Sequence, residues 1–166
     1  MDVQAIFENF RRTVTEHYFD MNGRVGRAQF WYFALAYIVI AIGLAVVQVA
    51  LFFLPLSALF GLAMLLPCAG MGARRLQDVG KNGQLIWVLL IPSFLIQLVG
   101  LLMWGPLGAL GFLAFYLTIG WLLNLVALVA AVAAIYFWCQ PGDPGPNAYG
   151  PPPPVFDPST RVSPSP

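Results

Sequence analysis

Apolar residues occur in two long runs, separated by a short polar segment. No Asp, Glu, Lys, Arg or His lies between Ala28 and Ala73, and none lies between Asn82 and Gly142. A helix of about 20 apolar residues crosses the hydrocarbon core of a bilayer. Each run is long enough for two such helices. The pattern therefore predicts an all-α protein, a polytopic membrane helical bundle with four transmembrane helices.

Turn-forming residues divide each run. Pro55 and Ser57 mark a turn in the first run, and residues 104–108, Trp-Gly-Pro-Leu-Gly, mark one in the second. Pro67 is expected to kink or tilt the second span. A three-span arrangement, with the first run as one long helix and a re-entrant piece, stays open as the alternative. The four expected spans are residues 31–54, 56–72, 85–103 and 109–138.

The basic residues indicate the orientation. Apart from Arg161 in the tail, they precede the first span or lie between the second and third, whereas both expected turns are uncharged. By the positive-inside rule, both basic patches and both termini are cytoplasmic. Residues 1–30 are then an amphipathic, basic cytoplasmic segment. Residues 31–140 form the transmembrane domain with a cytoplasmic loop at 73–84, and 141–166 form a Pro-rich cytoplasmic tail.

Aromatic residues expected at the membrane interfaces are Trp31, Tyr32, Trp87, Trp104, Tyr136 and Trp138, whereas Trp121 is expected to pack inside the last span.

The two ends of the chain differ in character. Residues 3–18 have helical periodicity, with Asp2 as a candidate cap, and indicate an amphipathic helix lying on the inner leaflet. A helix that docks a partner is the alternative interpretation. The tail holds most of the chain's 14 prolines and is expected to be extended or disordered.

Composition and missing motifs exclude several classes of protein function. The chain is 60% hydrophobic and 9% charged, which does not suit a soluble domain, and its net charge of +1 gives no attraction to nucleic acid. The two cysteines and single histidine lack metal-ligand spacing, so we expect no metal or cofactor. No nucleophile motif or phosphate-binding loop occurs, and we expect no catalytic residues and no enzyme. The expected spans carry no ionisable group for coupled transport.

Three motifs resemble those of a known family. They are Gly23-Arg24 with Arg27 before the aromatic group at 30–33, Arg74-Arg75-Leu76-Gln77-Asp78-Val79-Gly80-Lys81-Asn82-Gly83, and Gly142-Asp143-Pro144-Gly145-Pro146-Asn147-Ala148-Tyr149-Gly150-Pro151. In this order they resemble the bacterial domain-of-unknown-function 805 family, the YhaH-like proteins. The resemblance implies a small multi-span protein of the bacterial inner membrane and implies no reaction.

Some positions depart from the family pattern. Gln77 stands where the family usually has His, and Val79 where it often has Thr. Gln84 and Leu85 replace a frequent aromatic pair, and Ala148 takes a place often held by a basic residue. Any proton or metal chemistry that depended on the usual His would be missing from this chain.

The polar segments suggest a binding face. Arginine binds phosphate as a bidentate fork, and basic pockets beside spans bind lipid headgroups. The topological role of the basic residues is the simpler interpretation. Membrane lipids are the expected partners, and a homo-oligomer or a membrane-protein partner stays open. A small transporter or channel component and a lipid-acting membrane enzyme are the alternative functions. Candidate residues for a headgroup or partner are Arg24, Arg27, Arg74, Arg75, Asp78 and Lys81.

Overall fold

The computed structural model describes residues 3–51, 54–105 and 108–154, and in these it is helical without a β-strand. Two short turns interrupt the α-helices, a 3-10 turn at Gly83–Leu85 and a π-helical turn at Tyr116–Gly120. The α-helices are α1 (Val3–Thr15), α2 (Arg27–Ala50), α3 (Leu56–Ala63), α4 (Leu65–Asp78), α5 (Ile86–Leu102), α6 (Ala109–Phe115) and α7 (Trp121–Cys139).

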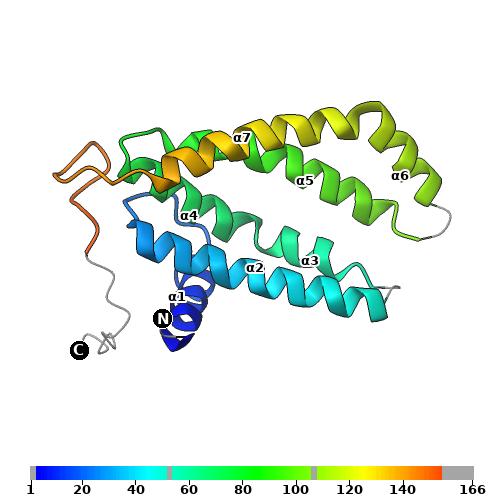
Figure 1. Cartoon of the computed structure of the whole chain (residues 1–166), viewed down its shortest axis with the longest axis horizontal. Coiled ribbons are helices and arrows are strands. Elements are labelled where there is room, and N and C mark those ends of the chain that lie inside the picture. Colours follow the sequence, from blue (N-terminus) through cyan, green and yellow to red (C-terminus); the bar gives the residue numbers. More distant parts are fainter. Residues whose placement is uncertain (1–2, 52–53, 106–107, 155–166) are drawn as a thin grey trace.

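The long helices lie side by side. Figure 1 shows α2, the α3–α4 pair, α5 and α7 running along the long axis of the molecule, with α1 crossing this direction at one end. The same end holds the first described residues and the segment that follows α7. The last residues of α2 and α5 and the first residues of α3 and α6 lie at the opposite end. The four apolar segments therefore run up and down, as the sequence predicts.

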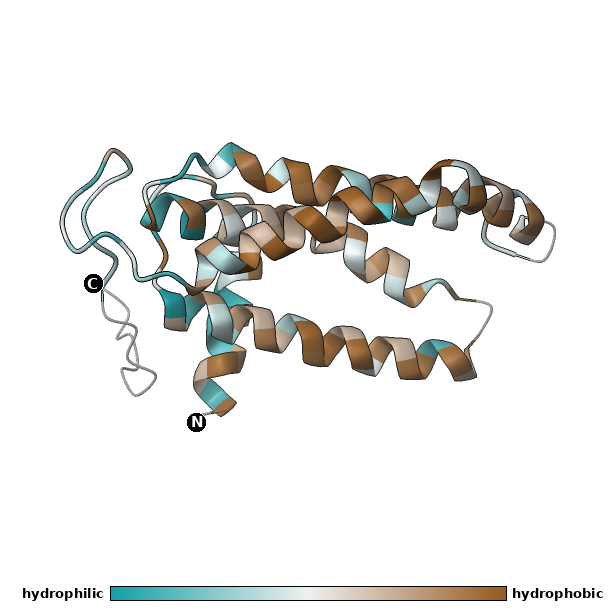
Figure 2. Ribbon diagram, turned by 45° about the horizontal axis from the view of Figure 1, so that its top comes forward, coloured by the Kyte–Doolittle hydropathy of each residue, from teal (hydrophilic) through white to brown (hydrophobic). Residues whose placement is uncertain are grey.

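The helices have the length and surface of membrane spans. Three stretches, Arg27–Ala50, Gly83–Leu102 and Ala109–Cys139, are long and apolar enough to cross a bilayer, and α3 with α4 makes a fourth if that bent pair is one span. Large apolar side chains cover their outer surfaces, and polar residues gather at the end that holds α1 (Figure 2). Such a surface fits lipid rather than water. The all-α membrane bundle is confirmed. The first run is not one long helix, because α2 ends at Ala50 and α3 begins at Leu56. Three spans with the bent α3–α4 pair as a re-entrant piece stay open beside the four-span form.

The expected kink at Pro67 is confirmed. α3 and α4 meet at an angle of 47°. Pro67 has no N–H to donate to the carbonyl of Ala63, and its ring would clash with that carbonyl in a straight helix. The Tyr18 hydroxyl donates to the Ala63 oxygen at 2.5 Å. The chain before α2 therefore satisfies the carbonyl that the proline leaves free.

α4 is the central helix, and it is longer than expected. Every residue from Ala69 to Asp78 is buried. Glycines permit this packing, because a Cβ at Gly72 would lie 2.6 Å from the Ile86 Cδ1 atom. In the segment expected as the cytoplasmic loop, 73–84, residues up to Asp78 continue α4 as helix. A helix can carry these polar residues because other parts of the chain supply their partners.

α1 confirms the amphipathic helix and ends three residues earlier than expected. Its inner face packs against α2, where the rings of Phe10 and Phe33 stack with centroids 5.6 Å apart. Asn9 adds a hydrogen bond of 2.9 Å to the carbonyl of Gln29. The proposed cap Asp2 lies outside the described residues.

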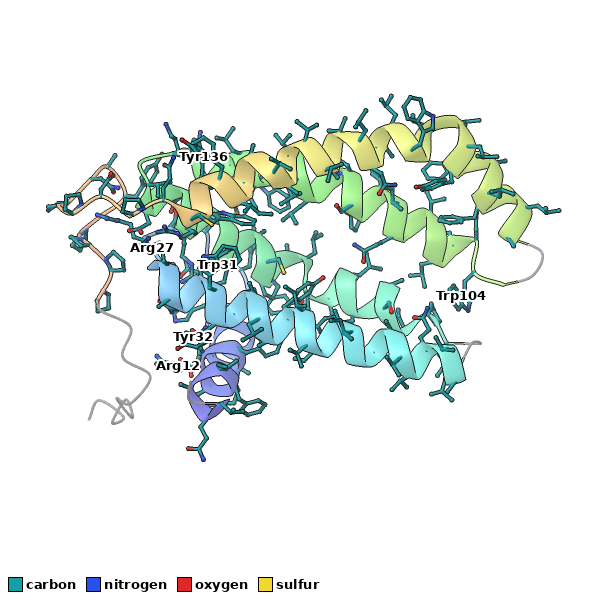
Figure 3. All side chains as sticks on the ribbon, viewed as in Figure 1. Arg12, Arg27, Trp31, Tyr32, Trp104 and Tyr136 are labelled. Atoms are coloured by element: carbon teal, nitrogen blue, oxygen red, sulfur yellow. The ribbon has the colours of Figure 1, made fainter. Side chains whose placement is uncertain are left out.

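Aromatic residues mark both ends of the bundle. Figure 3 shows Trp31, Tyr32 and Tyr136 at the end with α1, and Trp104 at the opposite end. This agrees with the expected aromatic belts. Trp121 is different. Its side chain is 51% exposed and its indole N–H donates to the Thr118 carbonyl, so the prediction that it packs inside the bundle is wrong.

We predict that Tyr18→Phe lowers the free energy of unfolding by about 1 kcal/mol, the usual net value of one hydrogen bond. The substitution leaves the Ala63 carbonyl without its donor. Thermal unfolding of the purified protein in mild detergent measures the loss. Tyr136→Phe is the matched control, because its hydroxyl makes no hydrogen bond within the described residues. Equal melting temperatures for the two variants would show that the Tyr18 bond is dispensable.

Candidate functional site

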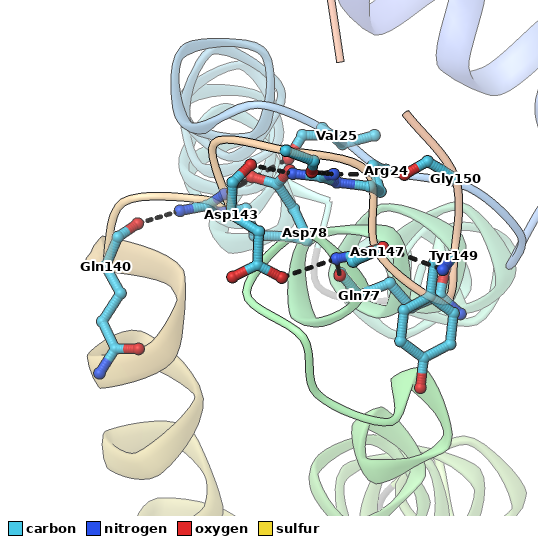
Figure 4. Close-up of polar contacts among 11 residues, drawn as sticks. Arg24, Val25, Gln77, Asp78, Gln140, Asp143, Asn147, Tyr149 and Gly150 are labelled. Carbon is cyan, nitrogen blue, oxygen red and sulfur yellow. Dashed lines mark hydrogen bonds and ion pairs between the residues drawn. The ribbon is translucent and has the colours of Figure 1, made fainter. Parts of the chain in front are cut away.

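The three sequence motifs meet in one buried polar cluster at the α1 end of the bundle (Figure 4). We call Arg24, Arg75 and Asp78 the arginine cluster. The two oxygens of Asp78 accept from different arginines, Oδ1 from Nε of Arg24 at 2.9 Å and Oδ2 from Arg75. The side chains of Arg24, Arg75 and Asp78 are 1%, 0% and 3% exposed. One carboxylate therefore joins α4 to the loop before α2.

Arg24 also binds the tail. Its guanidinium donates to the carbonyls of Asp143 at 2.5 Å, Gly145 at 2.7 Å and Gly150 at 3.3 Å. With the bond to Asp78 these make four hydrogen bonds. The tail segment thus wraps around the guanidinium group of Arg24, which its carbonyls surround.

Further bonds fix the tail on α4. The Asp143 N–H donates to the Asp78 carbonyl at 2.8 Å, and the Asn147 amide donates to the Gln77 carbonyl at 2.9 Å. Asn147 and Gly150 also pair through their backbones. Residues 141–154 form no helix, as expected, but they are docked on α4 rather than disordered. Residues 155–166 lie outside the described part.

Arg75 caps the end of α7. It donates to the carbonyls of Trp138, at 3.1 Å, and Gln140, while Arg27 reaches the Cys139 carbonyl at 3.5 Å. The last carbonyls of a helix lack intrahelical partners and carry its negative dipole end. α7 has no basic residue in its own last turn. Arginines from the first two motifs supply that charge instead.

The other predicted residues lie around this cluster. Arg74 is buried and pairs with Asp20 at 3.7 Å, whereas Arg75 pairs with Asp78 in its own helix. Arg27 is exposed and has no carboxylate partner among the described residues. Lys81 is exposed too, with its ammonium 5.5 Å from the ring centroid of Phe137. The structure thus separates the buried Arg24, Arg74 and Arg75 from the exposed Arg27 and Lys81.

The contacts of the arginine cluster link parts of the fold to one another. Its one carboxylate is bound on both oxygens, and Gln77, where the family usually has His, is buried beside it. No group of His, Cys, Asp and Glu within residues 3–51, 54–105 and 108–154 is placed to hold a metal ion.

Sequence reasoning missed two sets of contacts around the arginine cluster. Asp143 and Asn147 bind α4, and the carbonyls at the end of α7 accept from Arg75. The third motif was the available signal for Asp143 and Asn147, since it holds both. Nothing local marks a backbone carbonyl as the partner of a distant arginine.

The fold and this cluster define a small helical integral membrane protein. A family model described as "Protein of unknown function (DUF805)" matches residues 18–151, and the chain belongs to this family. The proteins called "Inner membrane protein YhaI" of Escherichia coli K12 and O157:H7 are each 31% identical over 140 residues, which is 83% of this chain and 89% of theirs. No solved structure matches.

We predict that Gly142→Ala displaces the tail, because a Cβ at this position would overlap the Asp78 carboxylate. The tail should become cleavable by protease in detergent, and the melting temperature should fall. Gly145→Ala is the matched control, since a Cβ there meets nothing within 4 Å. Equal protection of the two variants would contradict the observed docking of the tail on α4.

Proposed function

We propose that this chain is a non-enzymatic protein of the bacterial inner membrane whose basic cytoplasmic face binds anionic lipid headgroups. In this proposal the chain crosses the membrane four times, with the α3–α4 pair as the second span and both termini in the cytoplasm. The named relatives are inner membrane proteins, which supports the location.

The division of the basic residues supports headgroup binding. Arg24 and Arg75 are enclosed and donate to Asp78 and to carbonyls, so a phosphate would have to displace the tail to reach them. Arg27 and Lys81 are exposed and have no carboxylate partner among the described residues. Both lie beside the end of α7. This pair of uncompensated cations is the observation that carries the proposal.

The arginines of α1 provide a contrast. Arg11 donates to Glu8 at 2.6 Å, and this bond holds the pKa of the Glu8 carboxyl below its usual value. Arg12 pairs with Glu16 at 3.3 Å. Their charges are therefore balanced locally, and we expect them to contribute less to attraction of anionic lipid.

We predict that Arg27→Gln with Lys81→Gln weakens binding of phosphatidylglycerol about 30-fold, at about 1 kcal/mol for each basic residue. Native mass spectrometry in mild detergent with added phosphatidylglycerol measures the bound fraction. Arg11→Gln with Arg12→Gln removes the same formal charge and is the control. Equal loss of bound phosphatidylglycerol in both double variants would show that only net charge matters. No loss of bound lipid in either variant would refute headgroup binding.

The topology has its own test. Reporter fusions after Gly105 and after Pro166 should lie on opposite faces of the membrane, with the C-terminal fusion in the cytoplasm. The physical reason is the concentration of basic residues at one end of the bundle. Two reporters on the same face would rule out four crossings.

A further inference from the structure

An apolar groove follows the seam between α5 and α7, which lie side by side in Figure 1. It consists of two hollows of about 170 and 380 Å³. Val88, Ala130 and Ala133 line both hollows, so the two adjoin. The small alanine side chains leave the seam unfilled at the level where α5 and α7 approach the arginine cluster.

Lys81 lies at the polar end of this groove. Its backbone N–H donates to the carbonyl of Leu76 at 2.9 Å, and its ammonium lies 5.5 Å from the ring centroid of Phe137. Leu76 and Phe137 both line the groove. A cation therefore stands where the apolar seam meets the polar end of the bundle.

We propose that the groove and Lys81 form one site for an anionic phospholipid. An acyl chain lies along Ala130 and Ala133, and the phosphate contacts the Lys81 ammonium. This inference rests on the proposed function and narrows it, because it adds a chain-binding surface to a headgroup contact. The groove faces lipid, so an entering acyl chain leaves one apolar surrounding for another. The charge pair with Lys81 then selects the headgroup.

The charges favour a lipid over a second copy of this chain as the occupant. Each carboxylate within the described residues already has a partner in the chain. In a second copy, four of these carboxylates already face an arginine and would attract Lys81 less than the phosphate that an anionic lipid brings. The partnered carboxylates are Glu8, Glu16, Asp20, Asp78 and Asp143.

The test compares retention of phosphatidylglycerol and phosphatidylethanolamine with the same acyl chains, by native mass spectrometry of the full chain. Lys81→Ala should lower the preference for phosphatidylglycerol about fivefold, the factor for one basic residue near a headgroup. Ala133→Leu fills the groove and should lower retention to a similar extent. Ala45→Leu is the matched control, because Ala45 is an exposed alanine of α2 that does not line the groove.

The outcomes separate this inference from the proposed function. Loss of phosphatidylglycerol retention in Lys81→Ala and in Ala133→Leu, with Ala45→Leu like the wild type, supports the site. Loss in Lys81→Ala alone overturns the groove and leaves headgroup binding intact. Unchanged retention of phosphatidylglycerol in Lys81→Ala, in Ala133→Leu and in the Arg27→Gln/Lys81→Gln variant refutes the groove site and the proposed headgroup binding. A lipid-free dimer that Ala133→Leu converts to monomer would assign the groove to a second copy and overturn the lipid site.

Discussion

The carboxylate of Asp78 is the group on which the polar end of this bundle depends. It is the single anion between two buried guanidinium groups, and breaking a buried ion pair costs about 3–5 kcal/mol because a charge is left uncompensated. Arg24 and Arg75 carry one positive charge more than Asp78 balances. Carbonyls of the tail and of the α7 terminus surround that excess charge. The loop before α2, the end of α4, the end of α7 and the tail therefore stabilise one another.

Such a cluster requires close backbone approach, and glycine provides it. The tail can reach Asp78 because residue 142 has no side chain, and α4 can approach α5 because residue 72 has none. Gly80 adds a turn with φ of +69°, a conformation that L side chains rarely adopt, immediately after α4. Gly80 of the second motif and Gly142 of the third thus serve the same contact as the charged residues. Their role is geometric, and it explains why these motifs mix glycine with charge.

The sequence predicts the bundle well and the cluster in part. Hydropathy locates the spans because a bilayer constrains every residue in them, so the expected 31–54 overlaps most of the observed Arg27–Ala50. The Arg75–Asp78 pair is predictable from its spacing of three. Local patterns cannot show that Arg24 meets Asp78, 54 positions away, or the Asp143 carbonyl, 119 positions away. Local patterns therefore predict neither the burial of the polar end of α4 nor the docking of the tail on it.

The cluster also determines which cations of the polar end remain without a partner charge among the described residues. An arginine that donates four hydrogen bonds inside the protein, as Arg24 does, could bind a phosphate only by releasing the tail. An exposed ammonium such as that of Lys81 loses no carboxylate partner when a phosphate approaches. The basic residues therefore divide by burial: the inner arginines are held within the fold, and the outer cations are the ones that we propose bind anionic lipid. Their shared position at one end of the bundle follows from the bilayer, which excludes both kinds of charge from its centre.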